Sequence, residues 1–351
     1  GVGFQPDFVW IKQRNSSADH QLYDSVRGAT KLLESNKTTA EQTKSDGLKS
    51  FDSDGFTHGV ESAGNDNTGT HVVWCWDAGG TSQTATYVVK VVSDSGNKYR
   101  FDDFGTSAIT LELSEGGTYR FDQSDSSNSG HPLRFSTTSD GTHGSGSEYT
   151  TGVTTSGTPG SSGAYTEITV ASGAPTLYYY CTNHSGMGGQ ANTPSTKGYT
   201  NVKGTIQTKV VASDTTGHSI VSYTGNGSNN STVGHGLSST PDWVITKSRT
   251  SGTDNWSVWH SGLTSIQYYL SLNTTDMETS GSDRFGTNDP TSSVMNLGYA
   301  GSTNSNGAEY IMYCWTETTG VSKFGSYTGQ PNITTGFKPA FILIKNITDN
   351  S

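Results

Sequence analysis

Short apolar stretches alternate with polar turns along the whole chain. In Ile109, Leu111 and Leu113 every second residue is apolar, which predicts a strand with one buried face. Gly, Asn, Asp and Ser fill the segments between such stretches, as in chains of many short strands joined by tight turns. The pattern therefore predicts an all-β chain built from tandem β-sandwich domains.

One strand pattern occurs three times, at Pro6–Lys12, Pro241–Lys247 and Pro339–Lys345. In each copy a Pro is followed six positions later by a Lys, and the residues between them are mainly aromatic or aliphatic. Pro is tolerated at the first position of a strand, where its missing N–H is not needed. A second pattern, Val72–Trp76, resembles Ile311–Trp315. We infer that the chain contains internal repeats.

The spacing of the repeats predicts the domain organisation. Ser222–Gly225 resembles Ser326–Gly329, so one repeat is about a hundred residues long, the size of a β-sandwich. The excess length after the first repeat predicts an inserted domain. The first and third repeats are incomplete. This indicates either a piece of a longer polypeptide or strand addition between neighbouring subunits of a homo-oligomer or fibre. The expected domains are a partial repeat at 1–83, the insert at 84–196, a second repeat at 197–329, and at 330–351 the first strand of a further repeat, a strand that could complete a neighbouring subunit.

Composition and charge exclude several classes of function. Of the 351 residues, 21 are Lys or Arg and 31 are Asp or Glu, a net charge of −10. The basic residues do not cluster, so a nucleic-acid partner is not expected. A membrane partner is not expected either, because no apolar run approaches the ~20 residues of a membrane span. The sequence has neither a Gly-x-Ser-x-Gly nor a phosphate-loop motif, which predicts that the protein is not an enzyme.

Candidate metal ligands are concentrated in the stretch 177–189, where an aromatic strand runs into a short loop. Cys181, His184 and Met187 stand three residues apart on that loop. Two imidazoles, a thiolate and a weak thioether form a set of ligands that favours copper. The second imidazole would come from upstream, from His131 or from His143. We favour His131, because it precedes a strand-like Leu-Arg-Phe, whereas His143 lies in a Gly- and Ser-rich turn.

On these residues, the segment from about Tyr87 to Asn192 resembles a cupredoxin of the amicyanin or plastocyanin type. The resemblance covers under a third of the chain and implies a Greek-key sandwich. It also implies a copper site formed by His131, Cys181, His184 and Met187. The chain departs from the family at Asn183, where many members have Pro, and at Pro132, where many have an Asn that ties the two ligand loops together. These departures bear on the redox properties more than on the ligand set.

Several alternatives stay open for this loop and for the whole chain. Zinc also accepts Cys and His ligands, and the same residues could pack under the loop without a metal. A copper site could serve electron transfer or have a structural use. Trp256 is the best candidate for an exposed aromatic residue that stacks on a host-surface glycan, because the other six Trp residues lie in or beside repeated strands and are expected in the core.

The arrangement of repeats around the cupredoxin-like insert resembles virion appendage and tail-fibre proteins of marine bacteriophages. The residues that carry this resemblance are Phe8–Lys12, Val72–Gly80, Ser124–Phe135 and Tyr178–Gly189. It implies an extracellular or virion location and a structural or adhesive role, including host attachment. A Cys75–Cys314 disulfide is not expected, because equivalent positions of two repeats rarely face each other.

Overall fold

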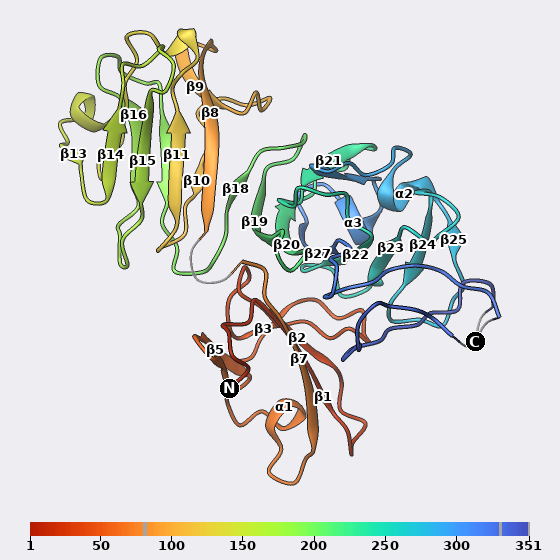
Figure 1. Cartoon of the computed structure of the whole chain (residues 1–351). Helices are drawn as coiled ribbons and strands as arrows, with labels where there is room; N and C mark the ends of the chain where they lie inside the picture. The colour runs from red at the N-terminus through yellow and green to blue at the C-terminus, as the bar shows by residue number, and fades with distance from the viewer. Residues whose placement is uncertain (80–82, 330–331, 350–351) are drawn as a thin grey trace. The chain divides into compact units, whose positions relative to one another are not determined.

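The computed structural model describes residues 1–79, 83–329 and 332–349 (Figure 1). These residues form 27 β-strands and only three short α-helices, which confirms the predicted all-β fold. No helix in the described ranges is long and apolar enough to cross a membrane. The chain divides into two compact units, one of residues 1–80 together with 206–351, and one of residues 81–205.

The first repeat contributes a three-stranded sheet to the first unit. Strand β1 lies between β2 and β7 and pairs antiparallel with both. Its odd-numbered side chains, among them Val9 and Ile11, pack into a small core with Leu32 and Leu48. The elements are β1 (Phe8–Gln13), β2 (Gln21–Asp24), β3 (Lys31–Leu32), β4 (Gln42–Thr43), β5 (Leu48–Asp52), β6 (Gly55–His58), α1 (Ser62–Asn65) and β7 (His71–Trp76).

The second repeat forms a larger antiparallel sheet in the same unit. Its strands follow the order β19-β20-β27-β22-β23-β24-β25, so β27 has a partner on both edges. The elements are β19 (Thr208–Ser213), β20 (His218–Thr224), β21 (Ser231–Gly234), β22 (Trp243–Ser248), β23 (Ser257–His260), β24 (Tyr268–Ser271), β25 (Thr279–Ser280), α2 (Ser282–Phe285), β26 (Val294–Leu297), α3 (Gly301–Asn304) and β27 (Glu309–Trp315).

The two repeats have the same strand register. Val9 stands opposite Cys75 between β1 and β7, and Val244 stands opposite Cys314 between β22 and β27. The Asp that follows the repeated Pro makes the same bonds in both copies. Asp7 accepts a hydrogen bond from the Ser25 hydroxyl at 2.8 Å and one from the Ala78 N–H at 2.9 Å. Its counterpart Asp242 accepts from Ser261 at 3.3 Å and from the Glu317 N–H at 2.7 Å.

The repeated Lys holds the loop that follows the strand. Lys12 Nζ donates to the carbonyl oxygens of Gln13 at 2.8 Å and Ala18 at 2.8 Å. Lys247 Nζ donates to those of Ser248 at 3.0 Å and Ser251 at 3.2 Å. Burial lowers the pKa of Lys247 to about 8, although the charge of Asp254 opposes that shift. The motif therefore encodes a strand together with the anchor of its loop.

Aromatic side chains join the two repeats within the first unit. The ring of Phe8 lies 4.4 Å from that of Tyr313, and Trp76 lies 6.3 Å from Trp315. Trp10, Trp243, Trp259 and Trp315 are buried and Trp74 and Trp76 are half-buried, which agrees with the core packing predicted for these six residues. Cys75, Cys181 and Cys314 are all free, so the expected absence of a Cys75–Cys314 disulfide is confirmed.

The strand predicted over Pro339–Lys345 is not formed, because residues 332–349 contain no β-strand. Ile342, Leu343 and Ile344 are exposed, whereas the equivalent strands β1 and β22 are largely buried between two neighbours. Phe341 packs against Trp74 at 5.5 Å between ring centroids. The segment therefore has the composition of a strand but lacks hydrogen-bonding neighbours, and Ala340 replaces the Asp that ties the other two copies.

The second unit consists mainly of two five-stranded sheets. Their orders are β10-β17-β16-β12-β13 and β14-β15-β11-β8-β9, with parallel pairing between β11 and β8 and between β10 and β17. The elements are β8 (Thr84–Ser93), β9 (Asn97–Phe101), β10 (Leu111–Glu112), β11 (Thr118–Asp122), β12 (Leu133–Ser136), β13 (Glu148–Tyr149), β14 (Val153–Ser156), β15 (Tyr165–Thr169), β16 (Leu177–Cys181), β17 (Gly189–Asn192) and β18 (Tyr199–Asn201), with 3-10 helices at η1 (Ser126–Asn128) and η2 (Gly141–Gly144).

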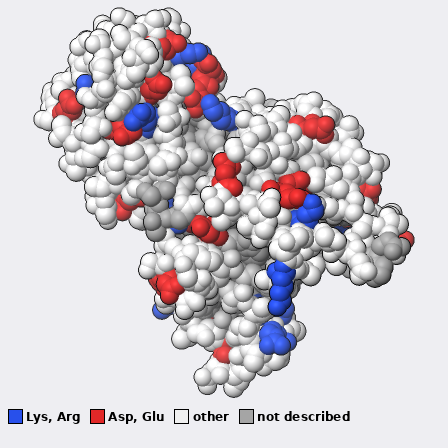
Figure 2. Space-filling view, viewed as in Figure 1, with Lys and Arg blue, Asp and Glu red and all other residues white. Residues whose placement is uncertain are grey.

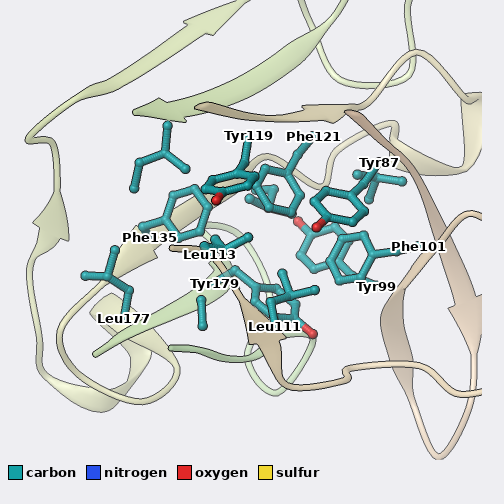
Figure 3. Packing of buried hydrophobic residues seen from close by; sticks show 14 of the residues in the cluster. Tyr87, Tyr99, Phe101, Leu111, Leu113, Tyr119, Phe121, Phe135, Leu177 and Tyr179 are labelled. Carbon is teal, nitrogen blue, oxygen red and sulfur yellow. The ribbon is translucent and has the colours of Figure 1, made fainter. Parts of the chain in front are cut away.

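Aromatic residues from both sheets fill the core of this unit (Figure 3). Tyr87 stacks on Phe121 at 5.2 Å, and Phe101 meets Tyr179 edge to face at 5.2 Å. Large rings bury much apolar area per residue, so a polar chain can still build a core. The core also contains Cys181 and Met187, which places one side of the ligand loop against it.

Charged side chains are sparse and mixed in sign on the face of the molecule drawn in Figure 2. Most of that face is formed by uncharged residues, as expected for a chain with 15% charged residues.

Candidate metal centre

The ligands predicted from the sequence lie at the ends of two neighbouring strands. Cys181 is the last residue of β16, and His131 lies two residues before β12. These strands pair antiparallel, with Leu133 opposite Cys181, so the pairing brings His131 to the Cys loop. His184 follows on the loop between β16 and β17, which also carries Met187.

Three of the four predicted ligands converge. Cys181 Sγ lies 3.8 Å from His131 Nδ1 and 3.7 Å from His184 Nδ1. The two imidazole rings are 4.5 Å apart between centroids, and the three ligand atoms all lie within 4.8 Å of one another. Both imidazoles therefore direct the same type of nitrogen at the thiol.

The two sulfur–nitrogen distances are compatible with a shared metal ion. A sulfur and a nitrogen bound to one metal at ~2.3 and ~2.05 Å are ~3.8 Å apart when the angle between the bonds is ~120°, and ~3.6 Å apart when it is tetrahedral. The separations of 3.7 and 3.8 Å lie at the trigonal end of this range. A trigonal plane of two His and one Cys is the arrangement typical of blue-copper centres.

Met187 is buried under the same loop. It belongs to the hydrophobic core cluster that contains Cys181, and its carbonyl oxygen accepts a hydrogen bond from the Tyr99 N–H at 2.9 Å. This bond fixes the loop backbone on β9. A Met thioether is the weak axial ligand typical of blue-copper sites, and the resemblance to cupredoxins assigns this role to Met187.

A buried hydrogen-bond network holds the His131 backbone. Its carbonyl oxygen accepts from Tyr99 Oη at 2.9 Å and from Gln123 Nε2 at 2.8 Å. Its N–H donates to the Asn128 carbonyl oxygen at 2.8 Å, and the buried Asn128 amide in turn donates to Val89 O at 2.7 Å. The position of His131 is therefore set by β8, β9 and the residue that follows β11, as well as by β12. Nothing in the sequence pattern singled out these supporting residues.

Hydrogen bonds join the two ligand loops and compensate for the departures from the cupredoxin pattern at Pro132 and Asn183. Asn183 Nδ2 donates to the Gly130 carbonyl oxygen at 2.9 Å. The Thr182 N–H donates to the Pro132 carbonyl oxygen at 3.2 Å. Pro132 cannot supply an amide side chain for the loop tie, but Asn183 supplies one from the opposite loop. The sequence singled out both positions as departures without predicting this compensation.

His143 does not join the cluster. It is exposed, and its Nε2 lies 3.0 Å from the Cys181 carbonyl oxygen, so it contacts the backbone of the ligand loop and not its sulfur. Further contacts with this loop come from Asp140, which accepts from the Gly186 N–H at 2.9 Å, and from the Lys98 ammonium, which donates to the Gly186 carbonyl oxygen.

The three ligand side chains differ in their exposure to solvent. Cys181 is buried, His131 is half-buried and His184 is exposed, so the site reaches the surface through the His184 ring. Partial burial and the nearby imidazole of His184 lower the pKa of His131. A lowered pKa favours the neutral imidazole, the form that binds a metal.

The structure overturns the candidate glycan-binding residue. Trp256 is 0% exposed, and its Nε1 donates to the carbonyl oxygens of Glu34 at 3.0 Å and Lys37 at 3.1 Å. A fully buried indole cannot stack on a sugar. The prediction of an exposed Trp256 was wrong because the residue packs against the first repeat, a contact that its own sequence neighbourhood does not indicate.

The chain matches the family model described as a domain of unknown function (DUF7483) over residues 1–100 and 190–351. No curated protein and no solved structure matches the chain. The family match omits residues 101–189, the segment that contains His131, Cys181, His184 and Met187. The chain belongs to the DUF7483 family, and its candidate metal centre lies in a segment outside the family match.

Proposed function

We propose that this chain is a structural subunit of an extracellular or virion fibre whose inserted domain binds one copper ion. The observation that carries the copper part is the convergence of Cys181 Sγ with His131 Nδ1 and His184 Nδ1 at 3.8 and 3.7 Å. The cupredoxin resemblance supports the same ligand set and adds Met187.

The donor set favours copper over other ions. Magnesium and calcium prefer oxygen ligands, whereas this site offers one sulfur and two nitrogens. Zinc accepts the same atoms but prefers a tetrahedral arrangement. Met187 adds a second soft sulfur to the ligand set that the cupredoxin resemblance implies, which favours copper. When bound, copper would supply a one-electron couple and a cross-link between the two ligand loops.

A structural use of the metal agrees with the surroundings of the exposed ligand. Ser185 and Gly186 follow His184 and are exposed, and the loop also contacts the charged side chains of Asp140 and Lys98. An electron-transfer partner would dock best on an apolar patch around the exposed imidazole. The small and polar neighbours of His184 favour a metal that fastens the loops.

Metal analysis tests the ligand set. After incubation with Cu(II) and gel filtration, the protein is expected to retain about one copper per chain. The Cys181→Ser and His131→Ala variants should lose it, while Cys75→Ser and His143→Ala, which change residues outside the cluster, should keep it. Equal copper retention in all five proteins would contradict the proposal.

The structural role is supported by the repeats and the surface. The two repeats share strand register and loop anchors, and the surface drawn in Figure 2 is mostly uncharged. The resemblance to phage appendage proteins supports an assembled, extracellular setting. Sedimentation velocity at rising protein concentration is expected to show self-association. A compact monomer at all concentrations would contradict this role.

A further inference from the structure

The sheet of the first repeat has one open edge. Strand β7 pairs with β1 only, and among the described residues no strand pairs with its other edge. Its counterpart β27 pairs with β22 on one edge and with β20 on the other. Accordingly, all residues of β7 are half-buried or exposed, whereas six of the seven residues of β27 are buried.

The sequence that covers this edge in the second repeat occurs again further along the chain. Strand β20 ends in Ser222-Tyr223-Thr224 and is followed by Gly225, and the same four residues stand at Ser326–Gly329. Residues 322–328 form no strand, and most of them are exposed, including Tyr327 at 51%. The chain therefore contains a second copy of the β20 sequence that forms no strand, and an open edge on β7 that is equivalent to the edge of β27 covered by β20.

We propose that residues 322–328 of one copy add as an antiparallel strand to the open edge of β7 in a second copy. This deepens the structural role proposed above, on which it rests, by naming the two surfaces that join subunits. Exposed strand edges pair readily with an added strand, because main-chain N–H and C=O groups supply the bonds.

The second repeat also predicts the register. There Ser222 stands opposite Ile311, and Ile220 stands opposite Tyr313. The equivalent pairs are Ser326 opposite Val72 and Phe324 opposite Trp74. Lys323 would stand opposite Cys75, and its long side chain can reach water while its stem packs on the sheet.

Within its own chain the segment contacts residues of the second repeat. Lys323 pairs with Glu317 at 2.7 Å, and the Ser322 hydroxyl donates to the Thr316 carbonyl oxygen at 3.0 Å. The ring of Phe324 lies 6.2 Å from that of Trp243, on the second repeat. These contacts leave the β7 edge available to another copy.

Disulfide trapping between two single variants tests the pairing. Val72→Cys and Ser326→Cys are made separately in a Cys75→Ser background, mixed in equal amounts and oxidised. A disulfide-linked dimer that contains one copy of each variant is expected, because facing residues of adjacent strands are close enough for a disulfide. Tyr327→Cys mixed with Val72→Cys is the register control and should give at least fivefold less dimer.

A second measurement separates this inference from the broader structural role. Ser326→Pro removes the backbone N–H at an exposed position and restricts the backbone there, so residue 326 can no longer donate to a neighbouring strand. The change should weaken self-association at least tenfold in sedimentation velocity. Unchanged self-association in Ser326→Pro, without trapping of the 72–326 pair, would overturn the strand addition and leave the structural role standing. A disulfide formed only within single chains of the Val72→Cys/Ser326→Cys double variant would overturn the exchange between copies.

Discussion

His218 is the most deeply buried histidine of the contact between the two repeats. Its ring stacks on Trp315 at 4.6 Å and lies 6.1 Å from Phe8, and its Nδ1 is 3.1 Å from the Cys314 carbonyl oxygen. Burial lowers its pKa to about 4, although the hydrogen bond to Cys314 opposes the shift. The folded protein therefore keeps this imidazole neutral where an unfolded chain would protonate it.

This depressed pKa makes stability depend on pH. The contribution is fully present above the unfolded value of about 6.5 and is lost as the pH falls from there towards 4, because the unfolded state binds the proton first. Between pH 7.5 and 5.5 the first unit should lose about 1.3 kcal/mol through His218. Urea unfolding of the wild type and of His218→Phe at both pH values checks this. An equal pH dependence in the two proteins would contradict it.

At the metal centre, Asn183 ties the Cys loop to the residue before His131. Its removal by Asn183→Ala should leave the ligands in place but loosen their spacing. We expect copper affinity to fall about tenfold, at the low end of the range for residues that orient metal ligands, because the amide is exposed. Competition titration with a copper chelator measures it. Ser185→Ala, an exposed change in the same loop, is the control and should leave affinity unchanged.

At the scale of elements, the ligand loop is pressed against its own strand at Gly188. A Cβ there would overlap the carbonyl oxygen of Tyr179 in β16. Gly188→Ala should therefore displace the loop and cost the second unit about 2 kcal/mol, the usual range for overpacking. Gly105→Ala is the matched control, because a Cβ at Gly105 meets no atom within 4 Å. Thermal unfolding compares the stabilities of the two variants. Equal stability would contradict the close contact between Gly188 and the Tyr179 carbonyl oxygen.

The strands of this molecule were predictable where their pattern was local. The alternation around β10, the aromatic run of β16 and the repeated motifs of β1 and β22 all appear in the sequence as strands. Segment 339–345 has the same pattern but forms no strand, because a strand also needs a hydrogen-bonding neighbour. Strand β13 and strand β17, which begins with Gly189, show little alternation of apolar residues. They form because they pair with β12 and β16 respectively.

At the scale of the whole molecule, a buried ionic network joins the two repeats. Arg27 bonds the Asp24 carboxylate and donates to the Tyr313 hydroxyl at 3.3 Å, and that hydroxyl donates to Asp24 at 2.7 Å. Glu41 bridges Arg27 at 3.2 Å and Arg249 at 2.9 Å. The side chains of Arg27 and Asp24 are 0% exposed, so their charges depend on each other.

Removing one partner leaves a buried charge without its counterpart. Arg27→Ala should destabilise the first unit by about 3–5 kcal/mol, as for other broken buried ion pairs. Arg14→Ala, at an exposed position, should change stability by less than about 0.5 kcal/mol. Hydrogen exchange measured separately for the two units would show which of them loses stability. A similar loss of protection in residues 81–205 would contradict the assignment of the network to the first unit.

The sequence predicted the four candidate ligands because three of them stand on one short loop and carry distinctive chemistry. It could not predict how His131 is held, since Gln123, Asn128 and Tyr99 are ordinary polar and aromatic residues whose roles arise from strand pairing. It also placed the two repeats in separate domains. Their union in one unit depends on contacts such as Trp256 with Glu34, between residues far apart in the chain.

Visible absorption shows whether a thiolate and two imidazoles of this site share one copper ion. On addition of one equivalent of Cu(II), the wild-type protein is predicted to develop an intense thiolate-to-copper band. The band should be absent in Cys181→Ser and retained in Cys75→Ser. A wild-type protein that shows no such band and retains no copper by elemental analysis would contradict the account.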